Sequence, residues 1–209
     1  MPITPTYTST TVLIGGVSTT VPSTAQAILD STNMSGGSGP SASIRPPGFV
    51  TGGCPNHHQR GHLIGNQLGG SGTDPNNLVT LTEGSNHPFM YEYEKLVYDY
   101  VKGHSGSKFT YLVTANYDTT KYYVAPAAPG GAASGAMSNP YCPLPCPESL
   151  TIEFFSTDGN GAKTYPIPVN AMTPTGFNSA YCGPVTVQNG GYKFHEGSLT
   201  HIKNNCWAT

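Results

Sequence analysis

Charged residues are scarce in this 209-residue chain and nearly balanced in sign. Nine Lys and Arg stand against eleven Asp and Glu, which gives a formal net charge of −2 at pH 7. Proteins that gather polyanions usually do so with a broad basic face, and nine cations leave little to build one. The composition therefore predicts that any positive site is local, built from an arginine, a bound cation or a protonated histidine.

Basic residues are absent before Arg45, and apolar runs are short throughout. A secretory signal needs a basic start and an apolar core longer than residues 11–14. We therefore expect either a mature form with an added initiator Met or export by a route without such a signal. No run approaches the roughly 20 apolar residues of a membrane span, so we expect no membrane partner.

Cysteine is limited to five positions, Cys54, Cys142, Cys146, Cys182 and Cys206. The favoured disulfides are Cys182–Cys206, flanking the C-terminal segment, and less firmly Cys142–Cys146, around a proline-stiffened loop. Reduced, buried thiols are the alternative. Together with low charge and abundant Thr, Ser and Gly, these cysteines favour a secreted, extracytoplasmic protein.

Histidine, by contrast, is concentrated: five of the seven lie between positions 57 and 104. Groups that titrate near neutral pH are those that acid–base chemistry needs. The surrounding pattern predicts a short strand ending at 60–64, a glycine turn at 69–72, a second turn at 73–77 and a strand at 78–82. A helix follows from about Pro88 to Lys102, with the apolar stripe Phe89, Tyr93, Leu96, Val97 and Tyr100.

Five residues of this stretch occur in a recognisable order, namely Arg60-Gly61-His62, then Asn86, then Glu94. The set is similar to the active-site pattern of the DNA/RNA non-specific endonuclease family, whose site is called ββα-metal or His-Me finger. The run Arg-Gly-His-Leu-Ile-Gly-x-Gln-Leu-Gly-Gly-Ser-Gly-Thr-Asp-Pro-x-Asn-Leu-Val-Thr-Leu is close to the version in bacterial secreted and polymorphic-toxin nucleases.

The resemblance is tight over residues 59–97 and loose from 98 to about 169, and it does not extend to 1–45 or 170–209. One departure concerns the residue before Arg-Gly-His, which is Asp in the best-known versions and Gln59 here. Since that Asp helps to organise the loop, the change affects local hydrogen bonding rather than the proposed base.

The resemblance implies a role for each of these residues. His62 would be the general base, Asn86 the direct ligand of Mg²⁺, for which Mn²⁺ substitutes, and Glu94 would hold the ion through water. Arg60 would pair with the phosphate. On an ideal helix Asn86 and Glu94 would lie about 12 Å apart along the axis, so they converge only if Asn86 precedes the first regular turn.

Other roles for the same residues remain open. Asn86 could cap the helix, and Glu94 could be a solvated residue paired with a lysine. Asn77 competes with Asn86 as ligand, although its position favours a turn. We expect His57, His58, His87 and Gln67 to bind substrate; His57 and His58 with Cys54 would make a zinc site only with a fourth ligand, which is not evident.

The remaining segments predict an α+β fold, an antiparallel sheet with few helices that carries the ββα-metal unit on one face. We expect a hairpin at 7–22, a helix at 23–30 and a long loop at 33–47, for which a surface lid or an ordered arm across the groove are alternatives. Further strands are expected at 48–51, 109–114, 117–124, 150–155, 164–169, 181–187 and 192–195. Residues 1–169 would form the nuclease domain, with the motif at about 57–102, and 170–209 a disulfide-stapled extension packed on it.

These features predict a metal-dependent endonuclease that cuts DNA, and RNA, with little sequence preference. A secreted binding or adhesion module with an inactive nuclease-like site is the alternative. As a toxin domain the nuclease would be held by an immunity or inhibitor protein.

Overall fold

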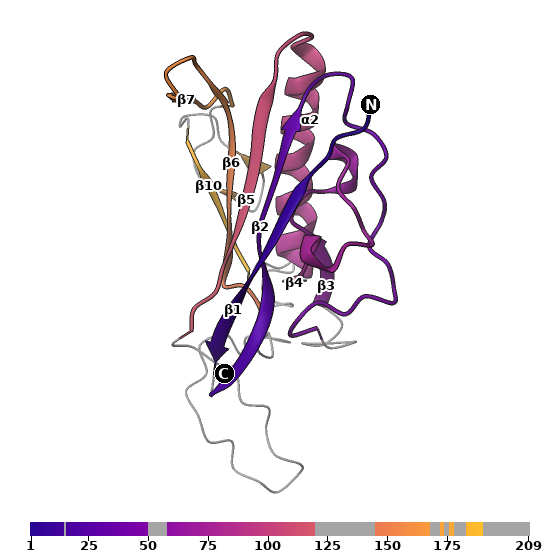
Figure 1. Cartoon of the computed structure of the whole chain (residues 1–209), viewed down its shortest axis with the longest axis vertical. Helices are drawn as coiled ribbons and strands as arrows, with labels where there is room; N and C mark the ends of the chain where they lie inside the picture. Colours follow the sequence, from indigo (N-terminus) through magenta and orange to yellow (C-terminus); the bar gives the residue numbers. More distant parts are fainter. Residues whose placement is uncertain are drawn as a thin grey trace, which may run out of the picture.

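Among the described residues, an antiparallel sheet with the strand order β1-β2-β5-β6-β10 forms the largest element (Figure 1). The computed structural model describes residues 1–14, 16–49, 58–119, 145–167, 172–173, 176–177 and 183–189. The strands of the main sheet are β1 (Thr6–Ile14), β2 (Val17–Leu29), β5 (Phe109–Asn116), β6 (Ser149–Thr157) and β10 (Val185–Gln188), and β7 (Lys163–Thr164) pairs with β6. A separate pair is formed by β8 (Met172–Thr173) and β9 (Gly176–Phe177).

The predicted hairpin is confirmed, whereas the predicted helix at 23–30 is wrong. Ile14 pairs with Val17 across the turn, and β2 then continues through residues 24–29 alongside β5. Every second residue of that segment, Ala25, Ala27 and Leu29, is buried, as a strand with one core face requires. Ala, Gln and Leu favour a helix locally, and pairing with β5 overrides that preference.

The predicted strand–loop–strand–helix unit is confirmed. Strands β3 (His58–His62) and β4 (Leu78–Thr82) pair antiparallel, and their connection contains the single turns η1 (Asn66–Leu68) and η2 (Pro75–Asn77). A π-helical turn, η3 (Ser85–Met90), then leads into α2 (Tyr91–Gly103). In Figure 1, β3 and β4 lie at the end of α2 where the helix begins.

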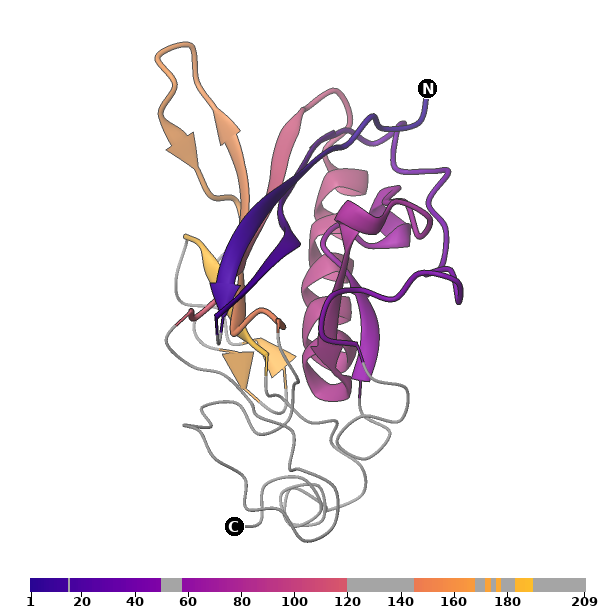
Figure 2. The same ribbon diagram turned by 60° about the horizontal axis from the view of Figure 1, so that its bottom comes forward.

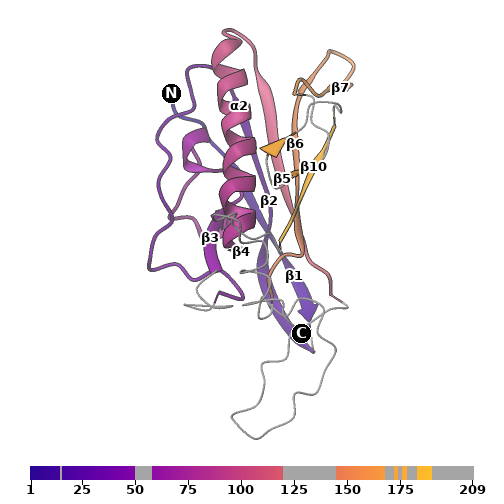
Figure 3. The same cartoon turned by 180° about the vertical axis from the view of Figure 1, so that it is seen from behind.

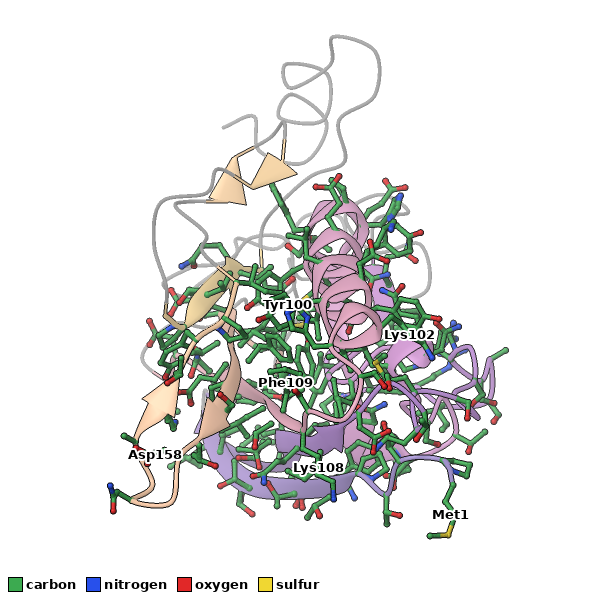
Figure 4. The ribbon with its side chains drawn as sticks, turned by 90° about the horizontal axis from the view of Figure 1, so that it is seen from above. Met1, Tyr100, Lys102, Lys108, Phe109 and Asp158 are labelled. Carbon is green, nitrogen blue, oxygen red and sulfur yellow. The ribbon has the colours of Figure 1, made fainter. Side chains whose placement is uncertain are left out.

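Helix α2 covers one face of the main sheet, as the turned views show (Figures 2 and 3). Its buried apolar residues are Tyr93, Val97 and Val101, and Figure 4 shows Tyr100 and Phe109 between helix and sheet. The rings of Tyr100 and Phe109 meet edge to face at 5.5 Å. Leu96, placed in the buried stripe by the sequence pattern, is 38% exposed instead.

The other predicted strands have mixed outcomes. Those at 109–114 and 150–155 are confirmed as parts of β5 and β6, and the one at 181–187 is confirmed in part, as β10. Gly48 and Phe49 are not in a strand, since Gly48 lies in a turn with φ 76°. Likewise residues 117–119 are not in a strand. Of the strand expected at 164–169, only Thr164 lies in a strand, β7, while 165–167 do not and 168–169 lie outside the described ranges.

Several predictions lie on residues outside the described ranges, namely those for His57, Cys54, Cys142, Cys182, Cys206 and the strand at 192–195. Cys146 is described and is disulfide-bonded. Both favoured disulfides therefore stay predictions. Within the described ranges, no helix is both long and apolar enough to cross a membrane.

Candidate active site

The long connection between β3 and β4 is organised by the amide of Asn77, which is fully buried. Its Oδ1 accepts from Ile64 N at 2.9 Å, and its Nδ2 donates to the carbonyls of Ile64 and Ser71 at 3.0 and 2.8 Å. The Asn77 carbonyl accepts from Leu63 N at 2.8 Å. Asn77 is thus a turn residue whose amide is used within the loop, as its sequence position favours.

Glycine at position 65 lets the loop approach α2 closely. Gly65 N donates to Glu94 Oε1 at 2.8 Å, and a Cβ on residue 65 would lie 1.9 Å from Glu94 Oε2. Glu94 sits on the buried side of α2, and helical side chains lean toward the N-terminus, which brings its carboxyl back to this loop. Any larger residue at position 65 would displace the carboxyl.

A cavity of about 200 Å³ opens where the end of β3 meets the beginning of α2. It brings together five of the residues predicted from the sequence, three for the chemistry and two for substrate. Its lining comprises Pro40, His62, Gly65, Asn66, Gln67, Asn86, His87, Met90, Tyr91 and Glu94. Most of these residues are polar.

His62 is half-buried at the end of β3, and its ring is held by the arm formed by residues 33–47. Nε2 lies 3.0 Å from the carbonyl oxygen of Ser38. Because a carbonyl can only accept, Nε2 carries the proton in the neutral ring, which leaves the lone pair on Nδ1. Burial lowers the pKa of His62 below its ordinary value, although the hydrogen bond to Ser38 partly opposes this.

The arm is held by hydrogen bonds to the glycine turn at 69–72, so of the alternatives for residues 33–47 the ordered arm is the one observed. Ser38 N donates to the Gly70 carbonyl at 3.1 Å, and Gly72 N donates to Ser38 Oγ at 2.8 Å. Ser41 N in turn donates to the Gly72 carbonyl at 2.8 Å. Ser38 therefore faces His62 from a fixed position.

Asn86 lies in η3, before the first regular turn of α2, as convergence with Glu94 requires. The break falls at His87, whose φ of −146° and ψ of 116° are extended, not helical. Asn86 is not the N-cap of α2, because that position is Met90. The main-chain carbonyl of Asn86 accepts a hydrogen bond from the N–H of Tyr91, and Asn86 is one of the residues that line the cavity.

Glu94 is only 6% exposed, so it is not a solvated helix residue. Burial raises its pKa to about 8, despite the lowering effect of the hydrogen bonds from Gly65 and Gln67. A buried carboxyl with so high a pKa is half neutral near pH 8, and a cation nearby would shift it to the charged form.

Two other residues predicted to belong to the site, His58 and Arg60, do not line the cavity. His58 is buried, with its ring 6.2 Å from that of Phe49, and it is not in the cavity lining. Arg60 is not in that lining either. Its Nε donates to the Ile44 carbonyl at 2.6 Å and a terminal nitrogen to the Ala42 carbonyl at 3.2 Å, and the guanidinium lies 4.4 Å from the Phe49 ring centre. Arg60 thereby holds the arm in place through two hydrogen bonds. A guanidinium has five N–H donors, so the others can contact a further group.

The donor set at the cavity fits a hard, hydrated cation. Within the described part of the chain, no group of three or more His, Cys, Asp or Glu could hold a metal, so a zinc-type cage is absent from it. Mg²⁺ keeps most of its waters and needs only one or two protein oxygens. The carboxamide of Asn86 and the buried carboxyl of Glu94 are oxygen donors of that kind.

A residue far along the chain supports this site, and sequence reasoning missed it. Asn189 is 3% exposed; its Oδ1 accepts from Thr82 N at 2.9 Å and its Nδ2 donates to the carbonyls of Thr80 and Pro147. Next to it, the Gln188 carbonyl accepts from Ser85 Oγ at 2.7 Å, one residue before Asn86. An isolated Asn after a short strand gives no sequence signal of such a role.

Comparison with known proteins places this geometry in a family. The sequence profile of the DNA/RNA non-specific endonuclease family matches residues 20–125, just over half of the chain. The chain therefore belongs to that family, and its β3–β4–α2 unit is the ββα-metal fold. No curated protein matches the chain.

Solved structures that are similar to this chain have low sequence identity to it. NucA from Streptococcus agalactiae, with magnesium ion bound, is 18% identical over 88% of this chain and 71% of that chain, with a TM-score of 0.47. An extracellular nuclease is 15% identical over 88% of this chain and 85% of its own, with a TM-score of 0.43. An extracellular endonuclease is 14% identical over 93% and 84%, with a TM-score of 0.47.

Proposed function

We propose that this protein is a metal-dependent endonuclease that hydrolyses phosphodiester bonds of DNA and RNA with little sequence preference. The observation that carries the proposal is that one cavity is lined by His62, Asn86 and Glu94, residues that the family pattern requires together. Membership of the nuclease family supports the reaction class.

In this proposal His62 is the general base. Its depressed pKa keeps the imidazole neutral at pH 7, and the Ser38 carbonyl leaves Nδ1 free to take a proton from the attacking water. The arm fixes the plane of the ring before substrate arrives, so little reorganisation is needed in the transition state.

Asn86 would hold a divalent ion directly, and Glu94 would hold it through water. Mg²⁺, with Mn²⁺ as a substitute, supplies positive charge that neutralises the phosphate and stabilises the leaving oxygen. Gly65 keeps the Glu94 carboxyl in place through its N–H. We propose that the donors of Arg60 not used by the arm contact the phosphate, and that Gln67, His87, His57 and His58 contribute to substrate binding.

We also propose an extracytoplasmic setting, which the disulfide at Cys146 and the low charge support. A toxin delivered to other cells would carry the same site. In that case an acidic immunity or inhibitor protein that blocks the cavity would copurify with it.

Plasmid digestion tests the proposed function. With Mg²⁺ the wild-type protein should nick and linearise a plasmid, and a chelator should abolish cutting. His62→Ala should lower the rate about 10²–10⁴-fold, the usual contribution of a general base.

His104→Ala is the matched control, because His104 lies at the end of α2 with Nδ1 2.7 Å from the Tyr100 carbonyl, away from the cavity. It should cut at the wild-type rate. Undiminished cutting by His62→Ala would refute the proposal, and an inactive wild-type protein would favour a binding or adhesion module.

A further inference from the structure

The cavity lining includes an exposed aromatic ring that the proposed chemistry does not use. Tyr91, the first residue of α2, is 47% exposed although it lines the cavity. The His87 ring, also in the lining, meets the Tyr91 ring edge to face with 5.0 Å between their centres. Such an edge contact covers at most one face of Tyr91.

Packing does not account for the position of Tyr91. Tyr93, two residues later, is 1% exposed in the core, and Tyr100 stacks against His104 and meets Phe109 and Phe154. Tyr98 is partly buried against the core as well, so Tyr91 is the exposed tyrosine of α2, and it lies at the rim of a polar cavity.

Electrostatic attraction for a polyanion is weak in this chain, and several of its cations already have partners. The partners are Asp99 for Lys95, Glu153 for Lys163, the Ser31 carbonyl for Lys102 and the Ala42 and Ile44 carbonyls for Arg60. Counterion release by basic residues, which supplies most of the affinity of many nucleic-acid binders, is therefore limited here. Contacts other than those of basic residues must therefore contribute to the affinity for a nucleic acid.

The cavity is too small to enclose a nucleotide, so additional contacts to a nucleic acid would lie at its rim. About 200 Å³ is less than the roughly 300–1,000 Å³ of sites that enclose a small organic ligand. A hydrated ion and a phosphate fit such a volume better than a whole nucleotide. The base attached to that phosphate would then lie outside, where the Tyr91 ring is exposed.

We infer that Tyr91 and His87 form a stacking subsite for one unpaired base beside the scissile phosphate, so that single-stranded DNA or RNA is preferred to duplex. A free base presents its π-face to an aromatic side chain, whereas bases in a duplex are stacked on one another. The inference rests on the proposed nuclease function and adds the substrate form to it.

Binding is measured first, without catalysis. Fluorescence anisotropy with the His62→Ala protein compares a labelled oligothymidylate of about ten nucleotides with a hairpin duplex carrying the same label. Adding Tyr91→Ala should weaken binding of the single strand about 10-fold and change duplex binding less than about twofold, since stacking of one base is lost. Tyr91→Trp, which keeps an aromatic face, should retain the affinity.

Leu96→Ala is the matched control, an exposed apolar residue of the same helix that does not line the cavity. It should leave both affinities unchanged. With His62 intact, Tyr91→Ala should raise KM for the single strand about 10-fold at unchanged kcat. The Tm of each variant confirms that the fold is intact.

The outcomes separate the two proposals. If the wild-type protein cuts nucleic acid but Tyr91→Ala binds both forms as tightly as its parent, or weakens both equally, the stacking subsite is wrong and the nuclease stands. If the wild-type protein cuts neither form, the proposed function fails. Selective loss of single-strand binding in Tyr91→Ala would still support the subsite in that case.

Discussion

At the scale of single residues, the neighbours of His62 determine what its ring can do. The Ser38 carbonyl fixes the proton on Nε2, and burial lowers the pKa of the imidazole. Glu94 shows the opposite effect, since burial raises its carboxyl pKa to about 8. Burial thus shifts the two pKa values in opposite directions, and perturbed pKa values of this kind are typical of sites that perform acid–base chemistry.

The pH profile of kcat/KM should reflect the direction of the His62 shift. A base acts in its unprotonated form, so activity should rise with pH through an acid limb and reach a plateau near neutrality. Because the pKa is lowered, the midpoint of that limb should lie below the ordinary histidine value of 6.5. Initial rates at subsaturating oligonucleotide across the acid range measure it, and a midpoint above 6.5 would contradict a lowered His62 pKa as the determinant of that limb.

At the scale of elements, the loop between β3 and β4 is stabilised by Asn77 rather than by apolar packing alone. Asn77→Ala removes three side-chain hydrogen bonds, each worth about 1 kcal/mol, so the free energy of unfolding should fall by about 3 kcal/mol. Urea denaturation followed by circular dichroism measures the loss.

The neighbouring Asn76→Ala supplies the control, since Asn76 contributes a main-chain bond from its N–H to Asp74, which the substitution keeps. Its cost should stay within about 0.5 kcal/mol. Equal costs at both positions would mean that the Asn77 amide does not organise the loop.

The ββα unit could be predicted from the sequence because its signals are local. Gly69 has a left-handed φ of 95°, the Asp74 carboxyl accepts from Asn76 N, and Pro75 opens η2, all readable from residue type and spacing. The segment at 23–30 could not be predicted this way, because its strand depends on pairing with β5, about 85 residues away.

The side chains that complete the site were harder to predict for the same reason. Burial of Glu94 depends on a contact with Gly65 across the loop, and the role of Asn189 depends on β4, more than 100 residues earlier. Arg60 was expected at the phosphate, which stays a prediction, and only the structure shows that its guanidinium binds the arm.

At the scale of the whole molecule, β10, the last strand among the described residues, connects the site to the main sheet. β10 pairs with β6, while Asn189 and Gln188 reach β4 and Ser85 at the approach to Asn86. Residues 170–209 were predicted as an extension packed on the nuclease domain, and the contacts of Gln188 and Asn189 give these two residues a supporting role in the site. The boundary between the two stays a prediction.

Asn189→Ala should therefore weaken metal-dependent activity without touching the cavity. Loss of its bonds to Thr80 and Thr82 would loosen β4 and η3, and the Mn²⁺ concentration for half-maximal cutting should rise about 10-fold, as when outer ligand supports are removed. Thr186→Ala, an exposed position on the same strand, should not change it. Equal Mn²⁺ dependence in both variants would contradict a supporting role for Asn189.

The central claim, that one amide oxygen holds the ion beside His62, is tested most directly by anomalous diffraction from crystals soaked in Mn²⁺. The account predicts a peak inside the cavity within bonding distance of Asn86 Oδ1, where Asn86 would hold the ion directly and Glu94 would hold it through water. A peak on another residue, or a cavity that stays without metal in crystals of an active enzyme, would contradict it.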